Sequence, residues 1–397
     1  MKIKGRRVIF GDPKPVDILI FDEVNSQYVR QAINKKHSIG IFHVRPEDIF
    51  IGPRVFLHFL GLLPGMYFKE LKSSNRGWLI GLFRQLKLIY FMACFITIRP
   101  KAIVTLIDNS GDFHWCSKNY RRFPFIAIQN GCRLSFDSSG VDGFYLQHYF
   151  CFGEHESNLF QNIRYEVENF YPVGSVTASL HITETDKILP KYDILVVSTW
   201  RGNIGFTQDV IDTMRSMRIM DELLAKYLRE RNYKAAIITR AAKNGGHWFI
   251  SEIGVDEGSY FKSIYGNYAE IIETDFTERN IYPLMQQSSF IISCLSSALL
   301  EGFGLGKKVL YCNFTGTGIY HADFDNAIVT TDSNYEAFSQ KLDLIINMPQ
   351  QQYDSQYKTL EQYYMSYPKD KQTYQTIANK IEDIIEKQSG SIKALNI

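Results

Sequence analysis

The chain has almost no excess of charge of either sign, and it has few cysteines. Its formal net charge is +2 over 397 residues, whereas dedicated nucleic-acid-binding proteins concentrate positive charge. We therefore expect no nucleic-acid partner. The six cysteines form no C-x-x-C pair, and most of them lie in apolar runs. This pattern is typical of reduced core thiols in a cytosolic protein, rather than of a disulfide framework or a zinc site.

Several well-known site motifs are also missing. The sequence contains no G-x-x-x-x-G-K-[ST] phosphate loop, no H-E-x-x-H zinc motif and no G-x-S-x-G nucleophile elbow. It shows no clear cluster of metal-ligating residues either. We therefore expect the protein to work with no metal ion and no cofactor.

Segments that would take the chain into a membrane are scarce. The first residues, MKIKGRRVIFGD, are basic but have no long apolar run, so we expect no secretory signal peptide. Residues 78–98 are long and apolar enough to span a bilayer, but Arg84 and Lys87 stand near their middle, where charge is costly. The pattern favours a buried or amphipathic helix, with contact at a membrane surface as the alternative.

Charge is distributed unevenly along the chain. Residues 1–180 hold 22 Lys and Arg against 15 Asp and Glu, a net +7, while residues 181–397 hold 22 against 27, a net −5. A basic N-terminal half suits anionic lipid headgroups or an anionic acceptor, although scattered solvated charges would give the same balance. We expect a cytoplasmic protein, and peripheral contact with the cytoplasmic face of the inner membrane stays open.

Short apolar strands alternate with helices in both halves of the chain, which is typical of an α/β fold with parallel sheets. Such an arrangement on both sides of a linker near residues 174–191 predicts a GT-B fold, in which two Rossmann-like domains face a central cleft that holds the ligand. We expect an N-terminal acceptor-binding domain over residues 1–180. A C-terminal donor-binding domain, with C-terminal helices, is expected over residues 190–397. The predicted strands are residues 16–21, 38–44, 101–107, 125–128, 149–152, 193–197, 235–239, 290–292 and a strand that begins at 309.

The most informative segment is residues 290–313, FIISCLSSALLEGFGLGKKVLYCN. Its apolar start predicts a buried strand, and Ser296 and Ser297 stand where the next helix begins. A helix N-terminus at the carboxyl edge of a parallel sheet binds anions such as nucleotide phosphates. We therefore predict that Ser296 and Ser297 hold a phosphate and that Glu301, one turn later, binds ribose hydroxyls. A plain helix cap followed by a solvated Glu is the alternative.

Two further strand ends carry groups that suit a phosphate. Thr199, Arg201 and Gly202 follow the first strand of the second half, where Gly permits close backbone approach and Arg can donate two hydrogen bonds. Arg240 and Lys243 follow the next strand and could neutralise the charge that develops on a leaving phosphate. We predict that both sets bind the donor, with a structural Arg and surface loop charges as the alternatives.

The first half offers a candidate base and candidate acceptor ligands. Asp108, Asp112 and His114 crowd the loop after one predicted strand, and an acceptor hydroxyl needs a base of this kind. One of these carboxylates could instead be the nucleophile of a retaining reaction, and an Asx turn is the structural alternative for Asp108. Asn130 and Arg133 follow the next strand and are predicted acceptor ligands, although Asn-Gly is also a plain turn.

Residues 198–201, STWR, resemble the P-T-W-R element of the glycerophosphotransferases that build teichoic acids. Residues 274–276, 280–287 and 293–297 resemble the same family's run into its T-D-Y-S-S element. The arrangement is also similar to GT-B transferases of bacterial surface polysaccharides, including the Kdo transferases of capsule and O-antigen assembly. The resemblance is clearest over residues 190–315.

The chain departs from the glycerophosphotransferase pattern at two places. Cys294 and Leu295 stand where that family has Asp-Tyr, and no His-Pro pair is evident, since Tyr320-His321 is only a loose substitute. The resemblance implies a glycosyltransferase that takes a nucleotide-sugar donor, with CMP-linked sugars among the candidates, and a glycan or lipid-linked acceptor. A transferase of glycerol or ribitol phosphate from a CDP-alditol is a close alternative. A nucleotide-sugar epimerase on the same fold and a glycan-binding module without turnover are the others.

Overall fold

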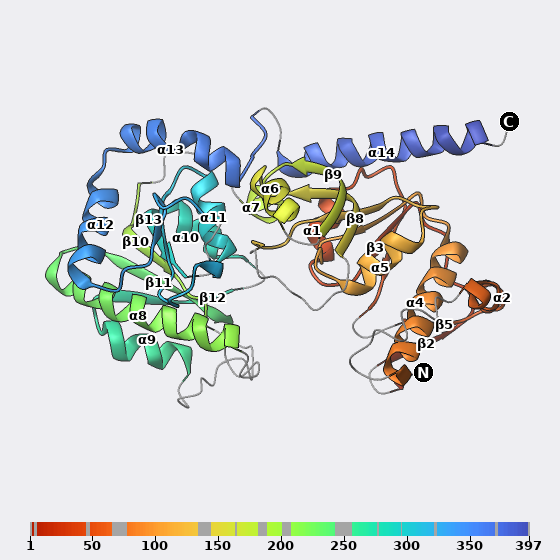
Figure 1. The fold of residues 1–397 in the computed structure, drawn as a ribbon, viewed down its shortest axis with the longest axis horizontal. Helices are drawn as coiled ribbons and strands as arrows, with labels where there is room; N and C mark the ends of the chain where they lie inside the picture. The colour runs from red at the N-terminus through yellow and green to blue at the C-terminus, as the bar shows by residue number, and fades with distance from the viewer. Residues whose placement is uncertain are drawn as a thin grey trace.

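The chain forms two α/β domains, each built on one six-stranded sheet, in the computed structural model (Figure 1). The structure describes residues 2–3, 6–44, 48–65, 78–133, 144–162, 165–181, 189–200, 208–242, 256–275, 278–294, 296–320, 324–369 and 372–395.

The first six-stranded sheet is parallel throughout. Its inner strands ILIF, AIVT and FIAI are buried at every residue, because helices cover both faces of the sheet. In spatial order the strands are β4 (Ile39–Phe42), β3 (Ile18–Phe21), β6 (Ala102–Thr105), β7 (Phe125–Ile128), β8 (Phe144–Cys151) and β9 (Tyr165–Pro172).

Helices of the first domain pack on opposite faces of this sheet. Phe91 and Phe95 from one helix pack with Phe21 of β3 on one face. Tyr28 and Val29 pack on the other face. The helical elements are α1 (Ser26–Gln31), α2 (Pro53–Leu62), η1 (Leu63–Gly65), α4 (Trp78–Ile98), α5 (Gly111–Asn119), α6 (His155–Asn162) and α7 (Val176–His181), and a small separate sheet contains β1 (Lys2–Ile3), β2 (Arg6–Phe10) and β5 (Asp48–Ile51).

The second six-stranded sheet is also parallel throughout. In spatial order its strands are β12 (Ala269–Thr274), β11 (Ala235–Ala242), β10 (Tyr192–Val197), β13 (Ser288–Ser293), β14 (Lys308–Cys312) and β15 (Val329–Thr330). The surrounding helices are α8 (Gln208–Glu230), α9 (Glu257–Tyr265), α10 (Ile281–Gln286), α11 (Ser297–Gly304), η2 (Gly318–Tyr320), α12 (Tyr335–Asn347) and α13 (Gln350–Tyr364).

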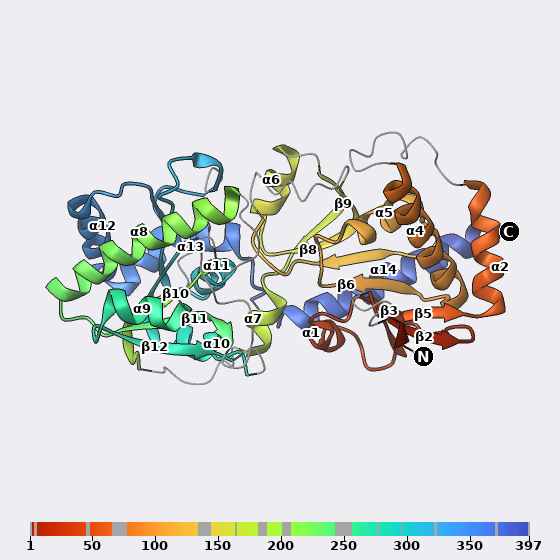
Figure 2. The same cartoon turned by 90° about the horizontal axis from the view of Figure 1, so that it is seen from below.

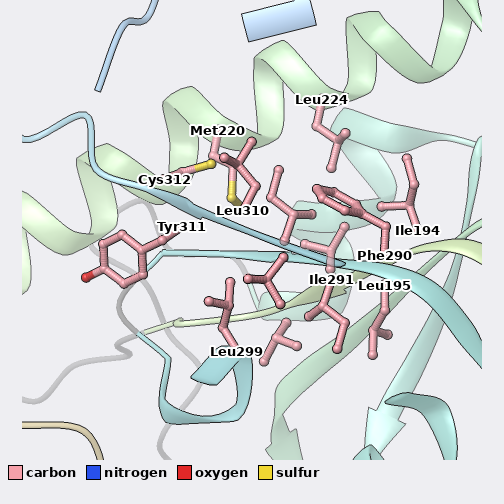
Figure 3. Close-up of a cluster of buried hydrophobic side chains, with 14 of the residues drawn as sticks. Ile194, Leu195, Met220, Leu224, Phe290, Ile291, Leu299, Leu310, Tyr311 and Cys312 are labelled. Atoms are coloured by element: carbon pink, nitrogen blue, oxygen red, sulfur yellow. The ribbon is translucent and has the colours of Figure 1, made fainter. Parts of the chain in front are cut away.

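Figure 3 shows how the second core is filled. Met220 and Leu224 of α8 cover one face of the sheet, and Leu299 of α11 covers the other. Ile291 of β13 and Leu310 of β14 lie between these layers and are fully buried. The helix that carries the predicted phosphate site is therefore fixed directly onto the two strands beside it.

The last helix returns to the first domain. Helix α14 (Thr373–Leu395) follows the C-terminal domain in sequence, yet it lies along the first domain (Figures 1 and 2). Its Ile377 and Ile381 pack in one cluster with Ile18 and Ile20 of β3. His37 adds a hydrogen bond of 2.6 Å to Glu382 of this helix. The predicted end of the second domain at residue 397 stays a prediction. Helix α14, which lies within that predicted domain, contributes side chains to the core of the first domain.

The expected α/β class is confirmed, and the apolar stretch at residues 78–98 forms helix α4 as predicted. Among the described residues, one helical stretch, Leu79–Ile98, is long and apolar enough to cross a membrane, and 44% of it is buried. All six cysteines are free, and five of them are buried. Strands β9 and β12 were not expected, because YEVENFYP and AEIIET mix charged with apolar residues at the two sheet edges.

Candidate functional site

The second sheet has a topological switch point, where the side on which successive strands are added changes. From the central strand β10, the chain first adds β11 and β12 on one side, and then crosses to add β13, β14 and β15 on the other. In open α/β sheets, ligands bind outside the carboxyl ends of the strands at such a switch point. Here that point lies between the ends of β10 and β13, so residues 198–200 and the start of α11 flank it.

The first sheet has its own switch point. Strand β3 pairs with β4 on one side and with β6 on the other, and the chain continues from β6 to β7. The loop after β6 contains Asp108, and the loop after β7 contains Asn130 and Arg133. The predicted acceptor and catalytic residues therefore lie at the carboxyl edge of this sheet.

Hydrogen bonds join the carboxyl edges of the two sheets. The backbone N–H of Cys132, in the loop after β7, donates to Ser297 Oγ at 2.7 Å. Arg279, which precedes α10, donates from Nε to the Tyr28 hydroxyl at 2.7 Å and from Nη2 to Asn25 Oδ1 at 3.1 Å. The loop after β7, a predicted acceptor loop, therefore contacts the start of α11, a predicted donor site, and the Arg279 contacts add a second link between the two edges.

The N-terminus of α11 offers groups that suit an anion. Ser296 is the N-cap residue, with extended backbone angles of φ −120° and ψ 128°, but its hydroxyl makes no capping hydrogen bond within the described chain. The first N–H groups of a helix have no intrahelical partner, and the helix dipole favours negative charge there. Ser297 is already occupied by Cys132. The two serines therefore differ, because Ser297 Oγ accepts from the opposite loop while Ser296 makes no cap hydrogen bond within the described chain. The role of Ser296 on a phosphate stays a prediction.

The end of β10 is fixed by a buried carboxylate. Ser198 Oγ donates to Glu257 Oε1 and accepts from the backbone N–H of Trp200 at 3.1 Å. The same Glu257 oxygen accepts from the backbone N–H of Arg240 at 2.8 Å. Arg240 Nη1 donates to the carbonyl of Trp200 at 3.1 Å. The predicted donor residue Arg240 therefore lies beside the end of β10.

Two buried polar atoms at this strand end make no hydrogen bond to the part of the chain that the structure describes. Thr199 Oγ1 and Trp200 Nε1 have no hydrogen-bond partner among the described residues, although Thr199 is 4% and Trp200 is 2% exposed. Buried polar groups are nearly always hydrogen-bonded, so an unpaired pair at a switch point indicates a place for a ligand or an ordered water. The predicted donor residues Arg201, Gly202 and Lys243 lie outside the described residues.

Glu257 was not among the residues singled out from the sequence. It stands in the first turn of α9, after the N-cap Asp256, and a Glu at that position is ordinarily solvated. It is 1% exposed here because Ser198 and the Arg240 N–H replace its water. The sequence carries no signal for this contact, because α9 and β10 meet only through the tertiary fold.

Glu301 faces the junction between the domains. Its Oε1 accepts a hydrogen bond from Ser175 Oγ at 2.6 Å, and its Oε2 lies 3.3 Å from the Tyr282 hydroxyl. Burial raises the pKa of Glu301 to about 7, and these hydrogen bonds oppose the rise. Because Ser175 belongs to the segment between β9 and α7, this carboxylate ties α11 to the interdomain segment. Its predicted role on a ribose stays a prediction.

Asp108 is fully buried, and both of its carboxylate oxygens accept hydrogen bonds from the protein. It accepts from Arg133 Nε at 3.0 Å, from Arg133 Nη2, and from the Tyr149 hydroxyl at 2.9 Å. The backbone N–H of Asn130 adds a fourth hydrogen bond at 3.3 Å, and Asn130 Oδ1 accepts from Arg133 at 3.0 Å. Asp108 and Arg133 therefore hold the loop after β7 in shape, and this arrangement favours a positioning role for both over direct contact with substrate.

Asp112 and His114 each have hydrogen-bond partners on other elements of the first domain. Asp112 accepts from Lys87 Nζ at 2.7 Å, and its side chain keeps 20% of its exposure. His114 is fully buried, and its Nδ1 donates to the carbonyl of Tyr145 at 3.1 Å. Burial lowers the pKa of His114 to about 4, so it is neutral near pH 7. His114 lies near enough to the buried Asp108 for the charge of Asp108 to act on its pKa. Asp112 is the one of the three predicted catalytic residues that retains access to solvent.

A cavity of about 570 Å³ lies at the opposite edge of the second sheet, lined by Tyr192, Arg231 and Lys234 among others. These residues stand at the amino ends of β10 and β11, away from the switch point. No group of three or more His, Cys, Asp or Glu that could hold a metal ion occurs among the described residues.

Comparisons with solved structures support the architecture. A glycosyltransferase from Rickettsia africae is 12% identical, with 95% of this chain and 99% of that chain covered, at a TM-score of 0.51. S. aureus MnaA with UDP is 12% identical, with 96% of this chain and 97% of that chain covered, at a TM-score of 0.50. A variant of the wall teichoic acid polymerase TagF with CDPG is 12% identical, with 95% of this chain and 90% of that chain covered, at a TM-score of 0.50.

No protein-family model matches the chain, and no curated protein sequence matches it. At 12% identity, a structural likeness shows the fold alone. The fold is GT-B, as predicted from the two sets of alternating strands and helices.

Proposed function

We propose that this protein is a glycosyltransferase of bacterial surface-polysaccharide synthesis that acts without a metal ion. It moves a sugar from a nucleotide-activated donor, with CMP-linked sugars among the candidates, to a lipid-linked or oligosaccharide acceptor of a capsule or lipopolysaccharide O-antigen. The observation that carries the proposal is the contact between the two carboxyl edges. There the N-terminus of α11 meets the loop after β7 through the 2.7 Å bond between Cys132 N and Ser297 Oγ.

The donor side of the proposal depends on anion chemistry. Breaking a bond between a sugar and a phosphate leaves negative charge on the phosphate, and fixed positive groups or N–H dipoles stabilise that charge. The free N-terminus of α11, the uncommitted Ser296 hydroxyl and Arg240 at the end of β11 are groups of this kind. Thr199 Oγ1, which is buried and has no hydrogen-bond partner among the residues that the structure describes, supplies a further hydrogen-bonding atom at the same switch point.

The acceptor side depends on the loops after β6 and β7. Asn130 is exposed at the loop tip, while the buried Asp108–Arg133 pair fixes that loop. Among the predicted bases, Asp112 is the one with solvent access, and the cation Lys87 keeps it in place at 2.7 Å. In this proposal Asp112 takes the proton of the acceptor hydroxyl, and Asp108 and Arg133 position the loop beside it.

A second reaction suits the same geometry. The resemblance of residues 198–201 to the teichoic-acid glycerophosphotransferases favours transfer of an alditol phosphate from a CDP-alditol. The acceptor oxygen then attacks phosphorus instead of carbon, and CMP leaves. The two reactions differ in the product, because the second adds a phosphodiester to the acceptor and the first does not.

The donor site can be tested with nucleotides alone. The purified chain is heated with CMP, CDP, UDP, UDP-GlcNAc or GDP, because a ligand that binds the native state raises Tm by mass action. One base is expected to raise Tm, and Ser296→Ala to weaken that nucleotide about tenfold, since a hydrogen bond to a charged group is lost. Ser355→Ala, on the exposed face of α13, is the control and should behave as the wild type.

Three outcomes would count against the proposal. A Tm that no nucleotide changes would remove the donor site and leave the glycan-binding module. A nucleotide-induced rise in Tm that is the same in Ser296→Ala as in the wild type would show that the nucleotide binds away from the start of α11. Conversion of a nucleotide sugar without any acceptor would instead favour the epimerase.

A further inference from the structure

The first domain exposes a large amount of apolar side chain on two neighbouring helices. Helices α2 and α4 pack against each other at the end of this domain that is remote from the second domain (Figures 1 and 2). Six large apolar side chains on them are 44% to 68% exposed. These residues, which we call the apolar face, are Phe56, Leu57, Leu60, Leu79, Ile80 and Phe83.

This exposure is not a by-product of core packing. In α2, the positions that contact the core are Val55, Phe59 and Leu62, so one side of the helix is already used. Phe56 and Leu57 add a second apolar side that faces solvent at 60% and 65% exposure. A helix that only covered a core would be polar on that side. An exposed apolar area of this size indicates an interaction surface.

The neighbouring strand ends extend the same surface. Phe10, the last residue of β2, pairs with Ile51, the last residue of β5, and the two are 74% and 56% exposed. Ile51 is separated from the start of α2 by Gly52 alone. The exposed apolar side chains therefore continue from the small sheet onto α2.

The two helices of the apolar face carry a net positive charge. Helix α2 contains Arg54 and helix α4 contains Arg84 and Lys87, while neither helix contains Asp or Glu. Asp112 pairs with Lys87 at 2.7 Å and lies 3.9 Å from Arg84, and Asp12 lies at the start of α2, so two carboxylates stand against three cations. Apolar side chains flanked by a net positive charge match the boundary between the headgroups and acyl chains of an anionic bilayer. We propose that the apolar face docks the protein onto the surface of a membrane that contains anionic lipids.

Docking on the surface fits the structure, and insertion across the membrane does not. The second half of α4 is the centre of the first core, where Phe91 and Phe95 contact Phe21 and Phe42. Drawing α4 into a bilayer would remove these side chains from the sheet. Its first turns, with Leu79, Ile80 and Phe83, are free to enter the interface while the rest stays in place.

This inference rests on the proposed function and deepens it, because a lipid-linked acceptor would be the reason for the protein to dock on a membrane. Helix α4 connects the two regions directly, because Lys87, one turn beyond Phe83, holds Asp112 at the start of α5. Docking would bring the carboxyl edge of the first sheet close to a headgroup at the membrane surface.

The test is flotation of the full chain with vesicles of phosphatidylcholine, with or without phosphatidylglycerol. The wild type is expected to float with the anionic vesicles, and less as salt is added. Leu57→Gln and Phe83→Gln should each weaken partitioning about tenfold, since each removes one side chain from the apolar contact. Leu344→Gln is the matched control, because Leu344 is 60% exposed on α12 of the second domain and should leave flotation unchanged.

Arg54→Gln is expected to lower binding to anionic vesicles about fivefold at low salt and to leave binding to phosphatidylcholine unchanged. Equal flotation of Leu57→Gln, Phe83→Gln and Leu344→Gln would overturn the inference, as would no flotation of the wild type. A wild-type dimer in light scattering that Phe83→Gln converts to a monomer, without vesicle binding, would assign the face to a second copy of the chain.

The flotation experiment tests the apolar face independently of the experiment that tests the donor site. Nucleotide-induced Tm shifts are measured without vesicles, so they also show that each variant is folded. Loss of flotation with an intact nucleotide shift reports on the apolar face alone. An absent nucleotide shift with intact flotation would remove the proposed donor site and leave the docking surface.

Discussion

The backbone N–H of Cys132 donates a 2.7 Å hydrogen bond to Ser297 Oγ, and this bond links the loop after β7 to the first residue of α11. A Cβ atom on the preceding Gly131 would lie 3.2 Å from the same Oγ, so a larger residue there would press on the Ser297 hydroxyl. The predicted acceptor loop and the predicted phosphate helix therefore fix each other's position.

The two serines at this helix start should respond differently to substitution. Ser297→Ala removes the acceptor for Cys132 N–H and should lower the free energy of unfolding by about 1 kcal/mol. Ser296→Ala removes no hydrogen bond that its side chain makes as N-cap, so it should change stability little and weaken nucleotide binding instead. Urea unfolding combined with nucleotide titration separates the two effects. A Ser296→Ala variant as unstable as Ser297→Ala would contradict this division.

The buried pair of Asp108 and Arg133 should be needed for folding. Arg133→Met leaves the fully buried carboxylate of Asp108 without its ion-pair partner, which typically costs about 3–5 kcal/mol. Arg84→Met, which removes a half-exposed cation 3.9 Å from Asp112, is the control and should cost less than about 1 kcal/mol. Chemical denaturation of both variants makes the comparison, and equal stabilities would show that the buried pair does not hold the loop.

Glu301 should make stability depend on pH. Its pKa is about 7 in the folded chain, against an ordinary value of 4.5 for a Glu carboxyl, so between these pH values the folded state binds more protons than the unfolded state. Its contribution is therefore present in full below about pH 4.5 and is lost as the pH rises through 7; the shift corresponds to ~3 kcal/mol.

Glu301→Gln keeps a neutral acceptor for Ser175 and should flatten this part of the profile. Some slope should remain, because burial also raises the pKa values of Glu156 and Asp221 to about 7. Glu336→Gln, an exposed residue of α12, is the matched control. Unfolding curves between pH 5 and pH 8 measure the slopes, and identical profiles for the wild type and Glu301→Gln would disprove the role of burial.

Helix α14 should be part of the first domain's folding unit. Ile381 is 1% exposed against the first sheet, so Ile381→Ala should cost about 2–5 kcal/mol through the cavity it leaves. Hydrogen exchange should then rise in β3 and β6 more than in β10 and β13. A rise confined to the second sheet would contradict this packing.

The sequence predicted the frame of the protein because its signals are local. Apolar runs such as ILIF and FIAI indicate buried parallel strands by themselves, and the Ser296-Ser297 pair marks the start of α11. The GT-B arrangement followed from the repetition of these patterns on both sides of a linker. By contrast, the packing of α14 on the first sheet depends on a contact across most of the chain, and no local pattern encodes it.

The site was predicted at the level of strand ends, but not at the level of side-chain direction. Asp108 lies in the expected loop, yet its carboxylate turns inward because Arg133 and Tyr149 can satisfy it there. Glu301 lies one turn into the expected helix, yet it faces Ser175 and not the helix start. Glu257 was missed because its partners come from other strands. Spacing along the chain locates a residue, whereas its partners depend on the packing around it.

Hydrogen exchange of the wild type with and without the nucleotide that raises Tm most would test the central claim most directly. We expect slower exchange at the end of β10 and in the first turn of α11, residues 196–200 and 296–300, at the switch point of the second sheet. Protection confined to Leu228–Lys234, which line the cavity at the opposite edge of that sheet, would contradict it.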